Sequence, residues 1–362
     1  MTTSDRLRVG LIGANGRWAP TSHIPAIQKV PQTELYAVCT AHEDTARAAA
    51  QKYGVELAYH DSKAMLANPQ IEAVAVVVRL PLHYALAKNA LEAGKPVYCE
   101  WPLTATLKET EELAALARKR KVHTMVGLQR RASPTYLRLR ELVQEGYVGQ
   151  VLSVNLTQIG GGQLDRPADR LWQRDAAVWS NTLSVGFGHA IDALCMVVGQ
   201  ITEVSGVVST QVKQWYNTET KQYLDVTAPD NIMISGRLES GAVVNASVGG
   251  HARHGSGNRM EIYGKEGTLM VTGGGEGRIM GGRKDDKALQ ELPIPDRLKW
   301  VPQEVQNSGS AFMVGQMWAN FARAIRTNQR IEPDFDSALR LHKLLDAVQR
   351  ASDTGVKQQV GV

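Results

Sequence analysis

The stretch LRVGLIGANGRW, residues 7–18, decides the fold. A short apolar run leads into Gly13, Asn15 and Gly16, and a helix-like segment follows to residue 30. A buried strand that turns through glycines into a helix is typical of the first unit of a dinucleotide-binding fold, in which backbone amides of the turn face a pyrophosphate. A strict Gly-x-Gly-x-x-Gly motif would place glycines at 13, 15 and 18, whereas Asn15 and Trp18 stand at the last two positions.

Five residues of this turn are predicted to bind the cofactor: Gly13, Asn15, Gly16, Arg17 and Trp18. Asparagine tolerates left-handed dihedral angles better than most residues, so Asn15 next to Gly16 still permits a tight turn. The alternative is a glycine-rich turn that binds nothing. The position of residues 13–18 in the first strand–helix–strand unit favours dinucleotide binding over this alternative.

Strand and helix patterns alternate through the first third of the chain. Strand-like runs at 34–40, 71–78, 96–100 and 122–128 are separated by helix-like stretches, and IEAVAVVV (71–78) has no polar face. Strands of this kind are typical of parallel sheets that helices cover on both sides. We therefore predict an α/β fold, with a Rossmann domain and its doubly wound parallel sheet over residues 1–128.

The pattern changes after residue 128. Residues 150–161, 201–212, 231–250 and 258–273 are rich in strand formers, and SGRLESGAVVNASV (235–248) predicts a hairpin around Ser240-Gly241. Residues 129–362 are therefore predicted to form an α+β domain. Its main feature is a large, open, mainly antiparallel sheet, and its C-terminal helices pack back onto the body.

Composition and charge narrow the function classes. The net charge is +5, but the densest basic run, 118–121, ends a helix pattern with acids in its first turn, so the helix dipole explains it without a nucleic-acid partner. No apolar run approaches the roughly 20 residues of a membrane span, and the start resembles no signal peptide. The three cysteines have neither disulfide nor metal spacing. These features predict a cytoplasmic protein with no membrane contact and no metal site.

Cofactor choice depends on the end of the second strand. An NAD-preferring protein usually carries an acid there for the ribose 2′-hydroxyl, whereas this chain has Thr40, Ala41 and His42. No carboxylate is present there to repel the 2′-phosphate of NADP, and Thr40 and His42 are predicted to contact that phosphate. This favours NADP over NAD modestly, and both cofactors stay possible. Arg79 and His83 follow the strand at 71–78, at the edge where open α/β sheets bind ligands, and are further predicted cofactor contacts. The alternative for Arg79 is a solvated loop arginine.

The segment AGKPVYCEWPL (93–103) resembles the hallmark of the glucose–fructose oxidoreductase/inositol dehydrogenase (Gfo/Idh/MocA) family, which ends in Glu-Lys-Pro. The resemblance extends through residues 127–151 and Gly188-His189-Ala-Ile-Asp192, and implies the same two domains. The family's catalytic lysine and aspartate fall on Trp101 and Val185, and its catalytic histidine on His189. Several of these motifs are most similar to the fungal galactose-pathway repressor branch, whose known member binds a dinucleotide but regulates transcription.

Each remaining candidate residue has a predicted role, and most have a structural alternative. His189 is the predicted proton acceptor, or a structural histidine held by Asp192 at i+3. Glu100, Trp101 and Pro102 are predicted to border the nicotinamide, although core packing explains a tryptophan equally well. The predicted substrate contacts are Arg131, Trp172, Asp192 and His251. For Arg131 and its neighbour Arg130 an ion pair at the domain junction is favoured, and for Trp172, like Trp179 and Trp215, simple burial is the commoner role.

Two functions follow. The first is hydride transfer between NAD(P) and a secondary alcohol or ketone of a sugar, cyclitol or related small molecule. The second is a dinucleotide-sensing regulator without turnover, which the loss of the family's lysine and aspartate favours. The resemblance also implies that the open sheet face pairs with a second copy, giving a dimer or tetramer.

Overall fold

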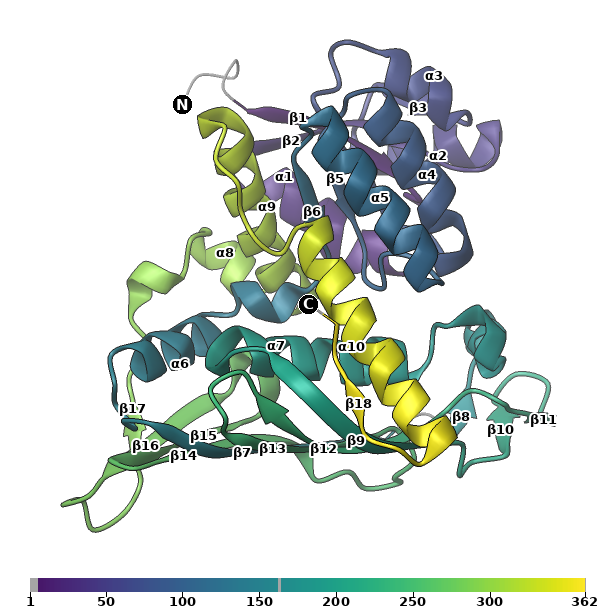
Figure 1. Ribbon diagram of the computed structural model, residues 1–362. Coiled ribbons are helices and arrows are strands. Elements are labelled where there is room, and N and C mark those ends of the chain that lie inside the picture. The colour runs from purple at the N-terminus through teal and green to yellow at the C-terminus, as the bar shows by residue number, and fades with distance from the viewer. Residues whose placement is uncertain (1–5, 162–163, 362) are drawn as a thin grey trace. The chain divides into compact units, whose positions relative to one another are not determined.

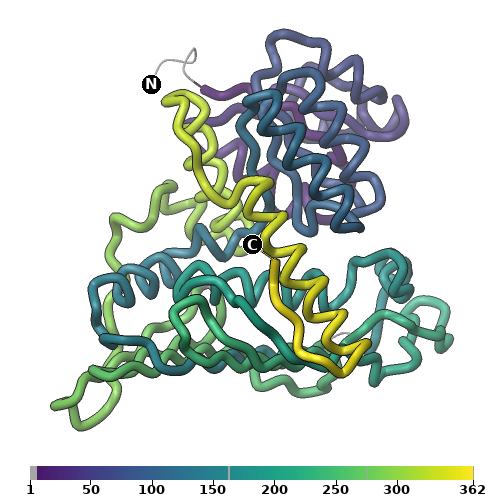
Figure 2. The backbone as a smooth tube through the Cα atoms, in the orientation of Figure 1, coloured from purple at the N-terminus to yellow at the C-terminus, as the bar shows by residue number. Residues whose placement is uncertain are grey.

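The computed structural model describes residues 6–161 and 164–361 (Figures 1 and 2). The chain divides into two compact units, and both are discontinuous. The first contains residues 1–132 and 299–339, and the second contains residues 133–298 and 340–362. The segment at 299–339 thus joins the N-terminal part of the chain, while the boundary expected at residue 128 stays a prediction.

The first unit is built on a parallel sheet of six strands in the order β3-β2-β1-β4-β5-β6. The predicted doubly wound sheet is therefore confirmed. Its strands are β1 (Leu7–Ile12), β2 (Thr33–Cys39), β3 (Leu57–Tyr59), β4 (Ala73–Val76), β5 (Val97–Cys99) and β6 (Thr124–Val126). All four residues of β4 are buried, as the run without a polar face predicts. The strand order reverses between β1 and β4, so the carboxyl ends of these two strands form the switch point of the sheet.

The helices of the first unit pack against this sheet or, like α8, against neighbouring helices. They are α1 (Ile24–Lys29), α2 (Glu43–Tyr53), α3 (Ser62–Ala67), α4 (His83–Glu92), α5 (Leu107–Arg120), α8 (Gln303–Gln306) and α9 (Ser310–Thr327). A π-helical turn (Ala19–His23) precedes α1. α2 ends at Gly54 with a left-handed φ of 67°, a conformation that glycine adopts without strain. Trp318 and Phe321 of α9 are fully buried in the same core as the strands, so α9 belongs to this unit although it comes near the end of the chain.

The second unit has a nine-stranded sheet in the order β17-β16-β15-β14-β7-β13-β12-β9-β18. Its strands are β7 (Val151–Ile159), β9 (Ile201–Ser209), β12 (Asn231–Leu238), β13 (Val243–Gly249), β14 (Gly257–Gly264), β15 (Gly267–Thr272), β16 (Arg278–Arg283), β17 (Gln290–Leu292) and β18 (Gln358–Gln359). Every pair is antiparallel except β7 with β13, which confirms the predicted mainly antiparallel sheet. The predicted hairpin joins β12 and β13, and Gly241 in its turn has a φ of 88°.

The remaining elements of the second unit are α6 (Pro134–Gln144), α7 (Gly188–Val198) and a small sheet of β8 (Asp165–Arg166), β10 (Gln214–Asn217) and β11 (Tyr223–Asp225). The long helix α10 (Phe335–Thr354) begins in the first unit and continues into the second. Asp334 caps its start by accepting a hydrogen bond from the Ser337 amide at 2.9 Å. Along β12, buried Ile232 and Ile234 alternate with exposed Met233 and Ser235, so one face of the large sheet is covered and the other is open.

Candidate functional site

The turn after β1 packs closely against the end of β4. Gly13 has a φ of 96°, and a Cβ atom at this position would lie 2.1 Å from the carbonyl oxygen of Val77. The Gly13 amide donates to the Cys39 carbonyl oxygen at 2.8 Å, which ties the turn to β2 as well. Only glycine fits this place, and the turn lies at the switch point where open α/β sheets bind ligands.

Asn15, Gly16, Arg17 and Trp18 form the exposed tip of this turn. The Gly16 amide donates to the Gly13 carbonyl oxygen at 3.0 Å, which closes the turn. Among the residues that the structure describes, none forms a hydrogen bond with the Asn15 amide, so this donor is open to a phosphate oxygen. A tight glycine turn with an exposed amide at the start of a helical segment fits a dinucleotide pyrophosphate.

Thr40 lies at the end of β2, but its hydroxyl faces inward. Its side chain is buried, and its Oγ1 donates to the His42 carbonyl oxygen at 3.0 Å and lies 2.7 Å from Thr45 Oγ1. The hydroxyl is thus engaged within the strand end rather than presented at the surface. His42 is exposed and precedes the first residue of α2. Of the two residues predicted to meet a 2′-phosphate, the structure therefore places only His42 at the surface.

Arg79 and His83, the two cofactor contacts predicted after β4, lie in different surroundings. Arg79 is exposed, whereas His83 is buried. The ring of His83 bridges two carbonyl oxygens, with Nδ1 2.8 Å from Pro102 and Nε2 3.1 Å from Val78. Burial lowers the pKa of this imidazole, although the nearby carbonyl groups oppose the shift. His83 thus links the chain after β4 to the chain after β5 instead of reaching outward.

Glu100, directly after β5, stands in a network of buried partners. Its Oε1 lies 2.7 Å from His23 Nε2, and the Gln129 side-chain amide donates to both carboxylate oxygens at 3.1 and 3.0 Å. The Trp318 indole N–H in turn donates to His23 Nδ1 at 3.2 Å. A Cβ atom on Gly127 would lie 2.6 Å from Glu100 Oε1, so a larger residue there would displace the carboxylate from its present position.

Three members of this network are not among the predicted site residues: His23, Gln129 and Trp318. They come from the turn before α1, the segment after β6, and α9, and no motif joins them. Two signals were available. Gln129 lies in the segment that resembles the family, and His23 lies inside the apolar segment after the glycine turn, where a histidine needs a buried partner.

Trp101 and Pro102 are both buried, and the peptide bond between them is cis. Trp101 is only 5% exposed, so the indole is mostly packed inside the unit rather than open as a stacking surface. Arg131, a predicted substrate contact, forms an ion pair with Glu332 at 2.9 Å within the same unit. This contact matches the ion-pair alternative, although the partner comes from the first unit itself.

His189 and Asp192 lie on α7 of the second unit. His189 is half-buried and Asp192 is buried. α7 follows a π-helical turn (Thr182–Phe187) that contains Val185, and the Asn181 side chain caps that turn by accepting from the Leu183 amide at 3.0 Å. Two residues three apart on a helix share one face, so the predicted pairing of His189 with Asp192 is geometrically allowed.

The other candidates of the second unit are dispersed. His251 is half-buried on the loop after β13, and its Nδ1 lies 3.5 Å from the Asp230 carbonyl oxygen. Trp172 is half-buried in a short 3₁₀ helix (Ala168–Arg174). Trp215 is only 3% exposed and its ring is covered by the guanidinium of Arg166 at 4.6 Å, so it is a core residue and not a sugar-stacking surface.

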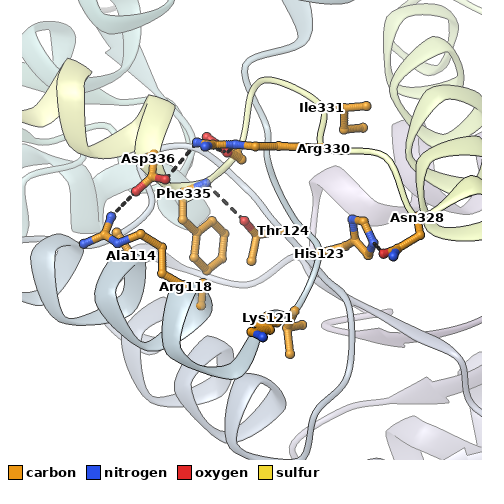
Figure 3. A pocket seen from close by; sticks show the side chains of 13 residues that line it. Ala114, Arg118, Lys121, His123, Thr124, Asn328, Arg330, Ile331, Phe335 and Asp336 are labelled. Atoms are coloured by element: carbon orange, nitrogen blue, oxygen red, sulfur yellow. Dashed lines mark hydrogen bonds and ion pairs between the residues drawn. The ribbon is translucent and has the colours of Figure 1, made fainter.

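The first unit also contains a cavity of about 290 Å³ beside β6, shown in Figure 3. Arg118 forms an ion pair with Asp336 there, and the Phe335 amide donates to Thr124 Oγ1 at 3.2 Å. His123 Nε2 lies 3.1 Å from Asn328 Oδ1. None of the predicted site residues lines this cavity.

Two expectations from composition can be compared with the structure. Over residues 6–161 and 164–361, no group of three or more potential ligands could hold a metal ion. The expectation that no run approaches the length of a membrane span needs a correction, because Ala176–Val198 is long and apolar enough by composition. Since 67% of its most apolar window is buried inside the protein, it is a core segment of the second unit.

Comparison with known proteins agrees with this architecture. Residues 7–128 match the oxidoreductase family with an NAD-binding Rossmann fold (GFO_IDH_MocA), and residues 134–273 match the C-terminal domain of Gal80p. Dehydrogenase aclE of Aspergillus oryzae is 32% identical over 65% of this chain and 68% of its own length. The galactose/lactose metabolism regulatory protein GAL80 of Kluyveromyces lactis is 28% identical over 67% of this chain and 57% of its own length.

The fold also matches solved structures. Levoglucosan dehydrogenase in complex with NADH and levoglucosan superposes with a TM-score of 0.89 at 22% identity, over 98% of this chain and 99% of that one. The sequence matches, the six-stranded parallel sheet and the glycine turn at its switch point lead to one conclusion. The chain belongs to the Gfo/Idh/MocA oxidoreductase family and carries a Gal80p-like C-terminal domain.

Proposed function

We propose that this protein is an NAD(P)-dependent oxidoreductase that transfers hydride between the nicotinamide and a secondary alcohol or ketone of a sugar, cyclitol or related small molecule. The observation that carries the proposal is the turn at Gly13, which only glycine can occupy and which presents the Asn15 amide at the switch point. When bound, the dinucleotide supplies the hydride acceptor or donor. Relatives named as dehydrogenases, such as aclE and levoglucosan dehydrogenase, support the reaction class.

In this proposal His189 accepts the proton of the substrate hydroxyl on an imidazole nitrogen. Imidazole is the side chain that most often serves as a general base. Asp192, one helical turn further on α7, orients the ring. Trp101 and Val185 stand where the family has its lysine and aspartate, which leaves His189 as the titratable residue of that family trio. Trp172 and His251, both half-buried in the second unit, stay the proposed substrate contacts.

We propose that both NADP and NAD bind, with NADP at least as strong. No acid stands at position 40 to repel a 2′-phosphate, and His42 is exposed to meet one. The Glu43 carboxylate, in the first turn of α2, forms an ion pair with Arg47, which offsets its repulsion. Since the Thr40 hydroxyl is engaged internally and Asp44 adds a further negative charge in the same turn, the preference for NADP is modest.

The open face of the large sheet is the proposed contact between two copies of the chain. Val207, Met233 and Val243 lie on β9, β12 and β13 and are 59%, 52% and 49% exposed. Exposed apolar side chains on neighbouring strands are typical of an interface. Light scattering at micromolar concentration should give the mass of a dimer or tetramer. A monomer would contradict this part of the proposal.

A second candidate function is a dinucleotide-sensing regulator without turnover. Two observations favour it: the Gal80p-like domain at residues 134–273, and the tryptophan and valine at positions 101 and 185. A turnover screen of sugars, polyols and aromatic alcohols with NAD and NADP separates the two. Cofactor reduction with any substrate supports the enzyme. Tight cofactor binding without turnover in the whole screen supports the regulator.

A further inference from the structure

The Glu100 carboxylate is held by uncharged donors. The indole nitrogen of Trp318 carries a hydrogen and cannot accept, so the hydrogen bond to His23 Nδ1 requires that Nδ1 carries no proton. The proton assigned to the His23 ring is therefore on Nε2, from which it is donated to Glu100 Oε1. This histidine is neutral, and its contact with Glu100 is a hydrogen bond and not an ion pair.

The remaining partner of Glu100 does not neutralise it either. Gln129 donates from a neutral amide to both carboxylate oxygens. Each of these donors points at the carboxylate, so the described partners of Glu100 are uncharged groups. The side chain of Glu100 is 12% exposed and that of His23 is fully buried, so water screens this charge poorly. The network thus fixes one negative charge at a defined place after β5.

Glu100 lies in one half of the proposed dinucleotide site. A Rossmann sheet consists of two mononucleotide-binding halves, with the dinucleotide lying across the carboxyl ends of the strands and its pyrophosphate at the first turn. Thr40 and His42, at the end of β2, lie in the half formed by β1 to β3. Glu100, at the end of β5, lies in the half formed by β4 to β6, which is left for the nicotinamide nucleotide.

We infer that Glu100 sets the preference of the site for the oxidised over the reduced cofactor. The nicotinamide ring carries a positive charge in NAD⁺ and NADP⁺ and none in the reduced forms. A fixed carboxylate without a neutralising cation in its network attracts only the charged ring. The inference rests on the proposed dinucleotide binding, and it assigns Glu100 a positioning and electrostatic role distinct from proton transfer.

The test is the ratio of the dissociation constant for NADH to that for NAD⁺, measured by calorimetry and by NADH fluorescence at fixed ionic strength. Glu100→Gln keeps the shape of the side chain and removes its charge. The ratio should fall by about tenfold, because two charges several ångströms apart in a partly desolvated site interact by an energy of that order. The fold of each variant is checked by circular dichroism.

Two substitutions of Gln129 form a matched pair and cover the case that Glu100→Gln does not fold. Gln129→Lys brings an ammonium group to the carboxylate and should lower the ratio as Glu100→Gln does. Gln129→Met removes the hydrogen bonds but leaves the charge, so the ratio should stay within about twofold of wild type. If the charge-changing variants weaken NAD⁺ and NADH equally, the inference is wrong while the proposed function stands. If wild type binds neither cofactor, the proposed function is wrong and the inference with it.

Discussion

The two halves of the proposed nucleotide site are built in opposite ways. At the end of β2, Thr40 and Ala41 have short uncharged side chains, the Thr40 hydroxyl is engaged by its own neighbours, and His42 is exposed. At the ends of β5 and β6 a carboxylate is fixed by buried groups from distant segments. A surface with few fixed polar groups can accept different ligands, whereas a charge that is fixed in place distinguishes between ligands of different charge. We therefore expect the half at β2 to accept both NAD and NADP, and the half at β5 to distinguish the oxidised from the reduced cofactor.

The largest effect is expected from the turn that both halves share. Gly13→Val should abolish NAD(H) and NADP(H) binding by calorimetry, because its Cβ atom would collide with the Val77 carbonyl oxygen and displace the turn. Gly54→Ala is the matched control. Gly54 also has a positive φ, but no atom lies within 4 Å of a Cβ there, so only a cost of about 1 kcal/mol in stability is expected. Unchanged cofactor affinity in Gly13→Val would rule out the turn as the binding site.

A substitution at His189, which lies outside both halves, should lower turnover without changing cofactor affinity. His189→Ala is expected to lower turnover by about 10²- to 10⁴-fold, the usual cost of losing a general base. Cofactor affinity should hardly change, because α7 belongs to the second unit. Steady-state kinetics and calorimetry on the same preparation check both statements. Full activity in His189→Ala would mean that another group takes the proton.

His83, in the half at β5, should make the stability of the folded protein depend on pH. Burial lowers the pKa of His83, so this imidazole takes up a proton at a lower pH in the folded protein than in the unfolded chain, where it protonates near pH 6.5. The unfolded state therefore binds the extra proton, and stability falls as the pH drops below about 6.5, by at most about 1.4 kcal/mol per pH unit. Denaturant unfolding between pH 7.5 and 5 measures the slope, which should be flatter in His83→Asn. An identical slope in that variant would assign the acid sensitivity to other groups.

The smallest effect is expected in the half at β2. Thr40→Asp introduces a carboxylate at the position where NAD-preferring relatives of the fold carry an acid, so the preference should move toward NAD by about tenfold. The measurement is the ratio of dissociation constants for NADP⁺ and NAD⁺. The matched control is Thr45→Ala, which breaks the same hydroxyl contact without adding charge and should leave the ratio near its wild-type value. A wild type that strongly prefers NAD would contradict the proposed tolerance of this half.

Local patterns were sufficient to predict most of the fold. The apolar run of β4, the glycine turn and the hairpin at Gly241 each depend on residues close together in the chain. β3 was missed because its three residues, Leu57–Tyr59, are too short a segment for a period to show. Runs rich in strand formers, with turns between them, predicted the large sheet in the same way.

The site was less accessible to such reasoning. Glu100 could be found because it stands in a recognisable motif, but its partners His23, Gln129 and Trp318 are joined only by tertiary packing. Burial was equally hidden: Trp101 and Thr40 look like binding residues in the sequence, and the structure turns both inward. Position along a strand is encoded locally, whereas the direction in which a side chain faces depends on what packs around it.

Both units are discontinuous, and this has a consequence for synthesis on the ribosome. His23 is translated almost at the start, yet its partner Trp318 follows 295 residues later. The N-terminal sheet therefore emerges with a histidine and a carboxylate already in its interior and without the helix that covers them. Contacts so distant in sequence form slowly, and until they form the exposed apolar face is open to aggregation. A chain whose synthesis stops before α9 would lack the helix that contains Trp318. Its first unit could then not complete its core, although all six strands of the sheet had been made.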